Sequence, residues 1–429
     1  MNGIGAESTD SPEEVETIAP LPLLERPRVD QVIFVDTKAA LAEAVSTMSK
    51  SKGPFAVDAE RASGFKYSQR AYLIQIHRSG TPIYLIDPAA ISPEASPEPF
   101  EALGALMASD EWILHAASQD IPCLRELGIH PTTVFDTELG SRIGGLPRVG
   151  LGAVTENLLG LKLAKEHSAV DWSIRPLKED WLNYAALDVD VLLELREALH
   201  SHLVLQSKLE WARQEFAQVV NAPPKPPKVD RWRGMTGLHE VKDSKSLSVA
   251  ESLWLHREEL AVKLDVSPGR LIPDYSIVAV AKTTPKSKPE LAGSKSFAGR
   301  ASRSYLDLWW RAIETGLKNL NPPPIRLPQV GIPNHRIWAN RFPEADARLK
   351  SARLVIASIS EEHNIPAENL LTPDYLRQMA WEPPAELSAT TVGDALSALG
   401  ARPWQVELLA NLLAEALAAP TEDVSPEVI

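Results

Sequence analysis

Two carboxylates stand two positions apart at the end of an apolar run, in Phe55-Ala56-Val57-Asp58-Ala59-Glu60. The run predicts a buried strand, and side chains at i and i+2 of a strand leave the same face. Asp58 and Glu60 are therefore expected side by side, where like charges repel unless a cation lies between them or one group is protonated. Hard divalent cations such as Mg²⁺ take carboxylate oxygens as ligands. The pair predicts half of a metal site, although an isolated Asp-x-Glu is more often a solvated turn.

Further acidic residues follow at positions that can complete such a site. Asp120 comes after an apolar run and begins a predicted helix, where an Asp is also a common N-cap. Asp188 and Tyr184 are four residues apart in a predicted helix and share one of its faces, whereas Asp190 is expected to face solvent. Three elements thus each offer a carboxylate and one adds a phenol, although each residue also has an ordinary use as a cap, a surface group or packing.

The elements that position these residues alternate between strands and helices. The region predicts an α/β domain with a mixed sheet, in which the second to fourth strands form an antiparallel meander. A short connection is expected at 134–137. The expected strands are 31–35, 55–60, 72–77, 82–87 and 112–116, and the expected helices are 38–48, 100–108, 120–127, 152–159 and 178–206.

Composition limits the class of protein. A chain of 429 residues is long enough for two or three domains, and 44% hydrophobic with 24% charged residues is ordinary for a soluble protein. A single cysteine, Cys123, excludes disulfides and cysteine zinc sites and fits a reducing cytoplasm. The sequence has no apolar run long enough for a membrane span and no features of a signal peptide.

The charge is unevenly distributed. The net charge of −13 argues weakly against a nucleic-acid-binding protein, but residues 223–353 carry 23 lysines and arginines against 13 acidic residues. This basic middle region is either an electrostatic footprint for a polyanion or a solvated, lysine-rich linker.

The segments before and after the α/β region differ from it in composition and in predicted structure. Residues 1–29 are acidic and proline-rich and predict a disordered tail, and a Pro/Lys linker is expected over 216–239. Everything that follows is helical, apart from a basic, loop-like stretch over 283–303. Pro273-Asp274-Tyr275 recurs as Pro373-Asp374-Tyr375, which predicts two related helical modules over 240–320 and 325–418, followed by a tail over 419–429.

The α/β region resembles the ribonuclease D family of 3′–5′ exonucleases, whose signature is four acidic residues and a tyrosine. The resemblance covers about residues 30–215 and implies a ribonuclease H-like exonuclease domain. The matching motifs are Val57-Asp58-Ala59-Glu60, His115-Ala116-Ala117-Ser118-Gln119-Asp120, Phe135-Asp136-Thr137, Asp171-Trp172-Ser173-Ile174-Arg175-Pro176-Leu177 and Tyr184-Ala185-Ala186-Leu187-Asp188.

The C-terminal half resembles the helicase-and-ribonuclease-D C-terminal (HRDC) domain, a small helical bundle. The match lies in His256-Arg257-Glu258-Glu259-Leu260-Ala261 and Pro268-Gly269-Arg270-Leu271-Ile272-Pro273-Asp274. The second copy diverges and has Asn369-Leu370-Leu371 in place of the Arg-Leu turn, which puts a nucleic-acid role for that copy in doubt.

The resemblance implies a hydrolase that uses two divalent ions, Mg²⁺ or Mn²⁺, to shorten RNA from the 3′ end and release nucleoside 5′-monophosphates. It implies that Asp58, Glu60 and Asp188 hold the ion that activates water, with Asp58 bridging to a second ion near Asp120. Tyr184 is expected to orient the water by hydrogen bonding, because a phenol with a pKa of about 10 is a poor base at neutral pH.

The expected partner is RNA with a single-stranded 3′ end, such as a tRNA precursor, with no membrane and no obligate protein partner. Two alternatives remain: an exonuclease acting mainly on DNA, and a non-catalytic RNA-binding scaffold, although such a scaffold usually lacks an acidic ligand and none is lacking here. The residues expected to contact phosphates are Arg257, Arg270, Lys282, Lys286 and Arg311.

Overall fold

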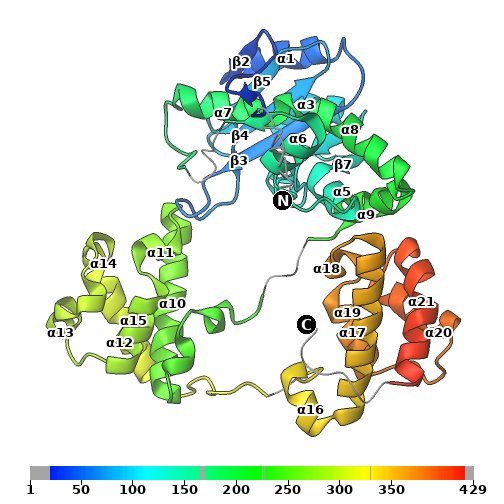
Figure 1. Cartoon of the computed structure of the whole chain (residues 1–429). Coiled ribbons are helices and arrows are strands. Elements are labelled where there is room, and N and C mark those ends of the chain that lie inside the picture. Colours follow the sequence, from blue (N-terminus) through cyan, green and yellow to red (C-terminus); the bar gives the residue numbers. More distant parts are fainter. Residues whose placement is uncertain (1–19, 165–169, 225, 227, 329, 421–429) are drawn as a thin grey trace, which may run out of the picture.

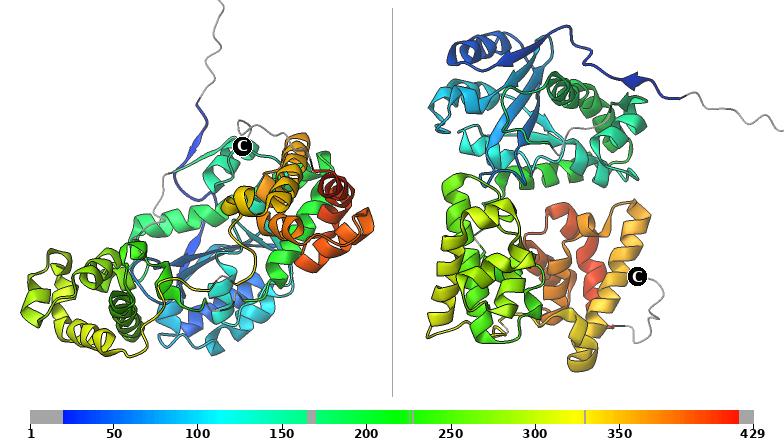
Figure 2. Two further views of the ribbon diagram at one scale, coloured as in Figure 1. Left: turned by 90° about the horizontal axis from the view of Figure 1, so that it is seen from below. Right: turned by 90° about the vertical axis from the view of Figure 1, so that its left-hand side faces the viewer.

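The protein consists of an α/β domain followed by two helical modules, as Figure 1 shows. This computed structural model describes residues 20–164, 170–224, 226, 228–328 and 330–420. In the right-hand view of Figure 2 the α/β domain lies above the two helical modules, which stand side by side. No helix in the described part of the chain is both long enough and apolar enough to cross a membrane.

A six-stranded mixed sheet forms the centre of the α/β domain, with strand order β2-β5-β4-β3-β6-β7. The neighbours β3, β4 and β5 are antiparallel, which confirms the predicted meander, and the outer pairs are parallel. The predicted connection at 134–137 is in fact the edge strand β7. The strands are β2 (Val32–Val35), β3 (Phe55–Arg61), β4 (Ala71–Arg78), β5 (Ile83–Ile86), β6 (Trp112–Leu114) and β7 (Val134–Asp136).

Helices cover both faces of this sheet. On one face, Phe55 and Val57 of β3 pack into a core that includes α1, α3 and α4. On the other, Ala56 packs with Ala185 and other residues of α7. The helices are α1 (Lys38–Met48), α2 (Pro88–Ile91), α3 (Glu101–Met107), α4 (Ile121–Glu126), α5 (Thr137–Ile143), α6 (Leu151–Leu159), α7 (Glu179–Asp190), α8 (Leu192–Leu205) and α9 (Leu209–Asn221). The helix predicted over 178–206 is thus two helices, and α9 extends into the predicted linker.

The segment before β2 differs from its prediction. Residues 20–29 are not a disordered tail, because β1 (Leu23–Leu24) pairs in parallel with β8 (Lys162–Leu163). Arg28 also forms an ion pair with Asp190, 2.8 Å between Nε and Oδ2. Asp190 is consequently buried, and its predicted exposure to solvent is wrong. Residues 1–19 of the predicted tail, and 421–429 of the other tail, lie outside the described residues.

The first helical module packs around two long helices, α10 and α15. Trp309 of α15 is fully buried in its core. The stretch over 283–303 is not a simple loop, because it contains α13 and α14. The helices are α10 (Ser244–Leu264), α11 (Pro268–Leu271), α12 (Asp274–Thr283), α13 (Lys288–Gly293), α14 (Arg300–Ser304) and α15 (Leu306–Lys318).

This module contacts the loop between β3 and β4. The Ser68 backbone N–H donates to Asp265 Oδ1 at 2.8 Å, and the Tyr67 hydroxyl donates to Glu258 Oε2 at 3.2 Å. Arg270 Nε donates to the carbonyl of Gly64 at 2.8 Å. The loop that follows the acidic strand is therefore held by the first helical module.

The second helical module shares a hydrophobic core with α5, α8 and α9 of the α/β domain. Trp211 of α9 stacks on Trp404 with ring centroids 4.9 Å apart. Glu215, also on α9, accepts hydrogen bonds from Arg402 Nε at 2.6 Å and Trp404 Nε1 at 2.9 Å. The helices are α16 (Trp338–Arg341), α17 (Pro343–His363), α18 (Ala367–Leu370), α19 (Pro373–Trp381), α20 (Ala389–Leu399) and α21 (Pro403–Ala418).

Candidate active site

Three of the predicted carboxylates meet where β3 passes beside α7. Asp58, Glu60 and Asp188 each place a carboxylate oxygen within 4.8 Å of the others, and all three side chains are half-buried. Asp58 and Glu60 leave the same face of β3 as Ala56, which packs against α7. The packing of α7 on β3 thus brings two distant parts of the sequence together. Such an oxygen cluster is suited to a hard divalent cation.

Asp120 lies in the same pocket but outside that group of three. It occupies the N-cap position of α4, yet its side chain makes no capping hydrogen bond, so capping does not account for it. Its Oδ1 is 3.6 Å from Arg61 Nη2, and the side chain is buried. The carboxylate is available to a second cation or to water molecules around one.

The carboxylates repel one another strongly without a cation. Burial raises the pKa of Glu60 well above its usual range, and the charges of Asp58, Asp188 and Asp120 raise it further. Burial and the charge of Asp58 likewise raise the pKa of Asp120, which Arg61 only partly offsets. A single nearby guanidinium does not neutralise four carboxylates. A multivalent cation supplies the missing positive charge.

Tyr184 lies one helical turn from Asp188 and faces the same pocket. Burial raises the pKa of its phenol far above the usual value, and the charges of Asp188 and Glu60 and a hydrogen bond with Asp188 raise it further. The hydroxyl therefore stays protonated at neutral pH and can act as a hydrogen-bond donor or acceptor.

A buried carboxylate fixes the turn that carries Asp120. Asp136, at the end of β7, accepts hydrogen bonds from the backbone N–H of Ala116 at 3.1 Å and of Ala117 at 2.9 Å. Ala116 has a positive φ of 64°, a conformation that alanine rarely adopts. Asp136 also caps α5 through the N–H groups of Glu138 and Leu139. The sequence included Asp136 in a family motif, but this bracing function depends on the neighbouring strand β6.

His115, in the same turn, lines the pocket as a neutral group. Its Nδ1 lies 2.9 Å from Thr137 Oγ1, and that hydroxyl donates to the carbonyl of Leu114. Burial lowers the pKa of His115 to about 4. The imidazole is therefore uncharged at neutral pH and available for hydrogen bonding in the pocket.

The same pocket, which has a volume of about 670 Å³, also contains two basic side chains and accessible backbone. Arg148 and Lys162 line it together with Gly150 and Gly152 at the start of α6, where an added Cβ would meet nothing within 4 Å. Arg148 pairs with Glu156, which lines the pocket as well, at 3.3 Å. Sequence reasoning did not single out these residues, because only the fold brings them into one pocket with the carboxylates. Cationic side chains and open backbone suit a phosphodiester.

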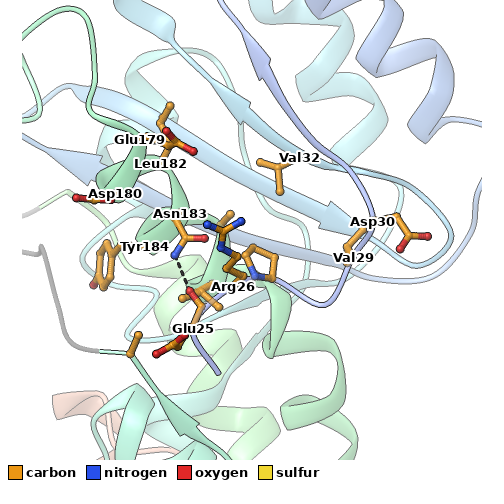
Figure 3. Close-up of a pocket in the computed structure, with 14 residues that line it drawn as sticks. Glu25, Arg26, Val29, Asp30, Val32, Glu179, Asp180, Leu182, Asn183 and Tyr184 are labelled. Carbon is orange, nitrogen blue, oxygen red and sulfur yellow. Dashed lines mark hydrogen bonds between the residues drawn. The ribbon is translucent and has the colours of Figure 1, made fainter. Parts of the chain in front are cut away.

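Figure 3 shows a second hollow beside the first, between α7 and the N-terminal segment. Asn183 Nδ2 donates to the carbonyl of Glu25 at 2.7 Å and fixes this segment to α7. Tyr184 lines both hollows. The second hollow has four acidic residues in its lining, and Arg26 is its basic residue. The acidic residues are Glu25, Asp30, Glu179 and Asp180.

The predicted phosphate contacts on the first helical module have different surroundings. Arg257 is 4% exposed and donates to the carbonyl of Ile272 and to Asp274. Its predicted phosphate contact is wrong, because this guanidinium is used inside the module. Arg270 is exposed but contacts Gly64 and the ring of Phe65. The remaining predicted residues, Lys282, Lys286 and Arg311, have exposed side chains.

Comparison with family models gives three consecutive matches. Residues 32–204 match the 3′–5′ exonuclease model, residues 246–313 match the HRDC domain, and residues 331–417 match the 3′ to 5′ exonuclease C-terminal domain.

Curated relatives are ribonucleases D. The protein of Shewanella sp. (strain ANA-3) is 27% identical over 355 residues, which cover 80% of this chain and 85% of that protein. The protein of Granulibacter bethesdensis is 29% identical over 287 residues, covering 65% and 69%.

Solved structures share the whole architecture. A protein from Bifidobacterium adolescentis is 36% identical with a TM-score of 0.83, covering 93% of this chain and 100% of that one. Escherichia coli RNase D has a TM-score of 0.62 at 24% identity, covering 86% and 98%, and supports the fold.

The fold and the acidic pocket define a metal-dependent 3′–5′ exonuclease with an HRDC region. The chain is similar to ribonucleases D over 65–80% of its length, which confirms the predicted resemblance, fold class and type of enzyme. It is accordingly a hydrolytic exoribonuclease, and the RNA reading is favoured over a DNA-specific enzyme or a non-catalytic scaffold.

Proposed function

We propose that this exoribonuclease removes nucleotides one at a time from the 3′ ends of structured RNAs such as tRNA precursors, and releases nucleoside 5′-monophosphates. The grouping of Asp58, Glu60 and Asp188 in one pocket with Asp120 is the observation that carries the proposal. E. coli RNase D is described as an exoribonuclease involved in structured RNA processing, which supports this class of substrate.

The donor set fits two divalent ions, Mg²⁺ or Mn²⁺. When bound, such ions activate a water molecule and stabilise the leaving 3′-oxygen. Asp58, Glu60 and Asp188 would hold one ion, and Asp58 and Asp120 would supply carboxylate oxygens for the other. This assignment uses each buried carboxylate and relieves the repulsion that raises the pKa of Glu60 and Asp120.

The surrounding residues position the RNA and the attacking water. The Tyr184 hydroxyl stays protonated and holds the water by hydrogen bonding. Arg148 and Lys162, which line the same pocket, contact the phosphates, and the glycines at the start of α6 allow the backbone to approach closely.

The substrate class is tested with a 5′-labelled single-stranded RNA and the DNA of the same sequence, each incubated with Mg²⁺, Mn²⁺ or EDTA. We expect a metal-dependent ladder that shortens from the 3′ end, faster for RNA, with nucleoside 5′-monophosphates as products. Faster shortening of DNA would overturn the RNA assignment. Bound but uncut RNA under every condition would indicate a binding scaffold.

A further inference from the structure

The second helical module carries its positive charge at one end. Between residues 336 and 353 there are five basic residues against two acidic ones. Between residues 354 and 418 there are only two basic residues against nine acidic ones. A module that is acidic as a whole thus has a concentrated basic region, around α16 and the first half of α17 (Figure 1).

A pocket of about 430 Å³ borders this basic region, with Arg336 in its lining. Asn334, His335 and Arg336 line it from the turn before α16, and Asp374 and Arg377 line it from α19. Arg353 of α17 lies near enough for its charge to act on His335. Two segments separated in the sequence therefore bring two guanidinium groups, those of Arg336 and Arg377, to one hollow, and the charge of Arg353 lies nearby.

The charge of this pocket is only partly neutralised. Arg377 Nη2 pairs with Asp374 Oδ1 at 3.0 Å, while Asp346 of α17 pairs with Lys350 at 2.9 Å. Among the described residues, Arg336 and Arg353 have no ion-pair partner.

The pKa of His335 reflects the positive charge around this pocket. Burial lowers its pKa, and the charges of Arg353, Arg377 and Arg336 lower it further, against a smaller opposing effect of Asp346. The imidazole is therefore neutral at physiological pH and, like the side chain of Asn334, can supply a hydrogen bond without adding charge.

We propose that this pocket binds a backbone phosphate of the RNA substrate, at a distance from the strand that enters the active site. Guanidinium groups in a concave site match the geometry of phosphate oxygens, which accept two parallel N–H bonds from one arginine. The proposal rests on the proposed function, because RNA is the polyanion on which the enzyme acts. It gives the divergent second module a nucleic-acid role that its sequence left in doubt.

The experiment measures the affinity of the full-length protein for a tRNA-sized RNA in EDTA, at several salt concentrations. Arg336→Gln combined with Arg353→Gln removes the two unpaired charges. Each phosphate contact on a single strand contributes about 0.7 to the slope of log K against log salt, so loss of this one contact should lower the slope by about 0.7 and the affinity about 5-fold at 0.1 M salt.

Two matched variants separate this effect from net charge and folding. Lys50→Gln with Lys52→Gln removes two exposed charges after α1, in the α/β domain, and should leave the affinity and slope unchanged. Arg336→Lys with Arg353→Lys keeps the charge and should retain most of the slope. Thermal unfolding establishes that each variant is folded.

Hydrolysis of a trinucleotide distinguishes this proposal from the proposed function, because a trinucleotide uses the carboxylate pocket alone. We expect the Gln pair to cut it at the wild-type rate. A wild-type protein that leaves the trinucleotide intact would overturn the proposed function, and the binding measurements would still decide the role of the pocket.

Equal affinity and slope for the two Gln pairs would overturn the RNA assignment. Calorimetric titration with inorganic phosphate tests a free anion as the other source of the same chemistry. Phosphate binding that disappears in Arg336→Gln/Arg353→Gln, with RNA affinity unchanged, would assign the pocket to a small anion and also overturn the proposal.

Discussion

Each carboxylate in the pocket has an ionisation state set by its neighbours. Glu60 and Asp120 are the groups whose pKa rises most, because both are buried next to other carboxylates. The metal-free pocket thus favours partial protonation, and metal binding must release those protons. Metal affinity and stability are linked through these residues.

This linkage predicts a pH-dependent response to metal. A carboxylate whose pKa is raised in the folded state favours folding below its unfolded pKa, and this stabilisation is lost as pH rises through the folded pKa. In EDTA, the melting temperature should therefore fall as pH rises above the usual carboxyl range, and Mn²⁺ should restore it more at pH 8 than at pH 5. Asp120→Asn should reduce the loss in EDTA. A Mn²⁺ effect independent of pH would contradict the linkage.

Tyr184 provides a second prediction at this scale. Tyr184→Phe removes the hydroxyl and its hydrogen bond with Asp188 but keeps all four carboxylates, so kcat should fall by up to about 100-fold through misplacement of the water. The apparent affinity for Mn²⁺, measured by calorimetry, should change little. Since the phenol does not ionise in the working range, the pH profile of kcat should keep its shape. A large loss of Mn²⁺ affinity would assign the tyrosine to metal binding instead.

At the scale of elements, β3, β6 and α7 each deliver one part of the site. Their relative positions depend on packing between the sheet and α7 and on the hydrogen bonds of Asp136 to the turn at Ala116 and Ala117. That turn contains no glycine at its left-handed position, so the carboxylate of Asp136 stabilises a backbone conformation that alanine otherwise avoids.

Asp136→Asn tests this bracing. An amide keeps one acceptor oxygen but directs an NH₂ group at a backbone N–H, so the turn that carries Asp120 should shift. We expect kcat to fall by about 100-fold with KM for a short RNA nearly unchanged. Thr37→Ala is the control, because it removes the N-cap of α1, at a cost of about 1 kcal/mol in stability, far from the pocket. Equal kcat in Asp136→Asn and wild type would refute the bracing role.

The elements that the sequence predicted best are those with strong local patterns. The meander of β3, β4 and β5 follows from apolar runs and a turn, and the site residues on β3 and α7 follow from spacing within one element. Asp190 was misjudged because its partner, Arg28, is 162 residues away. The prediction for Arg257 failed because the motif identifies the residue but does not show that its guanidinium is buried and pairs with Asp274.

At the scale of the whole molecule, both helical modules are attached to the α/β domain. The first holds the loop after β3 through Asp265 and Arg270, and the second joins α9 through a buried polar network around Glu215. Composition predicted separate modules but not these contacts, because the paired residues lie far apart in the chain and have no shared pattern.

The network around Glu215 predicts a strong and specific loss of stability. Glu215→Ala leaves the largely buried Arg402 without its partner, which should lower the free energy of unfolding by about 3–5 kcal/mol. Glu210→Ala, on the same helix, removes an exposed pair with Arg213 and should cost at most about 1 kcal/mol. Thermal unfolding of the two variants makes the comparison. Equal shifts would mean that the second module is not anchored at Glu215.

The most direct test of the whole account follows the 3′ end of a 5′-labelled RNA in Mn²⁺ with wild type and Asp58→Ala side by side. Asp58 is a proposed ligand of both ions. It lies on β3 of the α/β domain, outside the hydrophobic cores of the helical modules. The account predicts stepwise shortening by the wild type and an intact label with a folded Asp58→Ala protein, as judged by thermal unfolding. Shortening at the wild-type rate by the folded variant would contradict the assignment of this pocket as the active site.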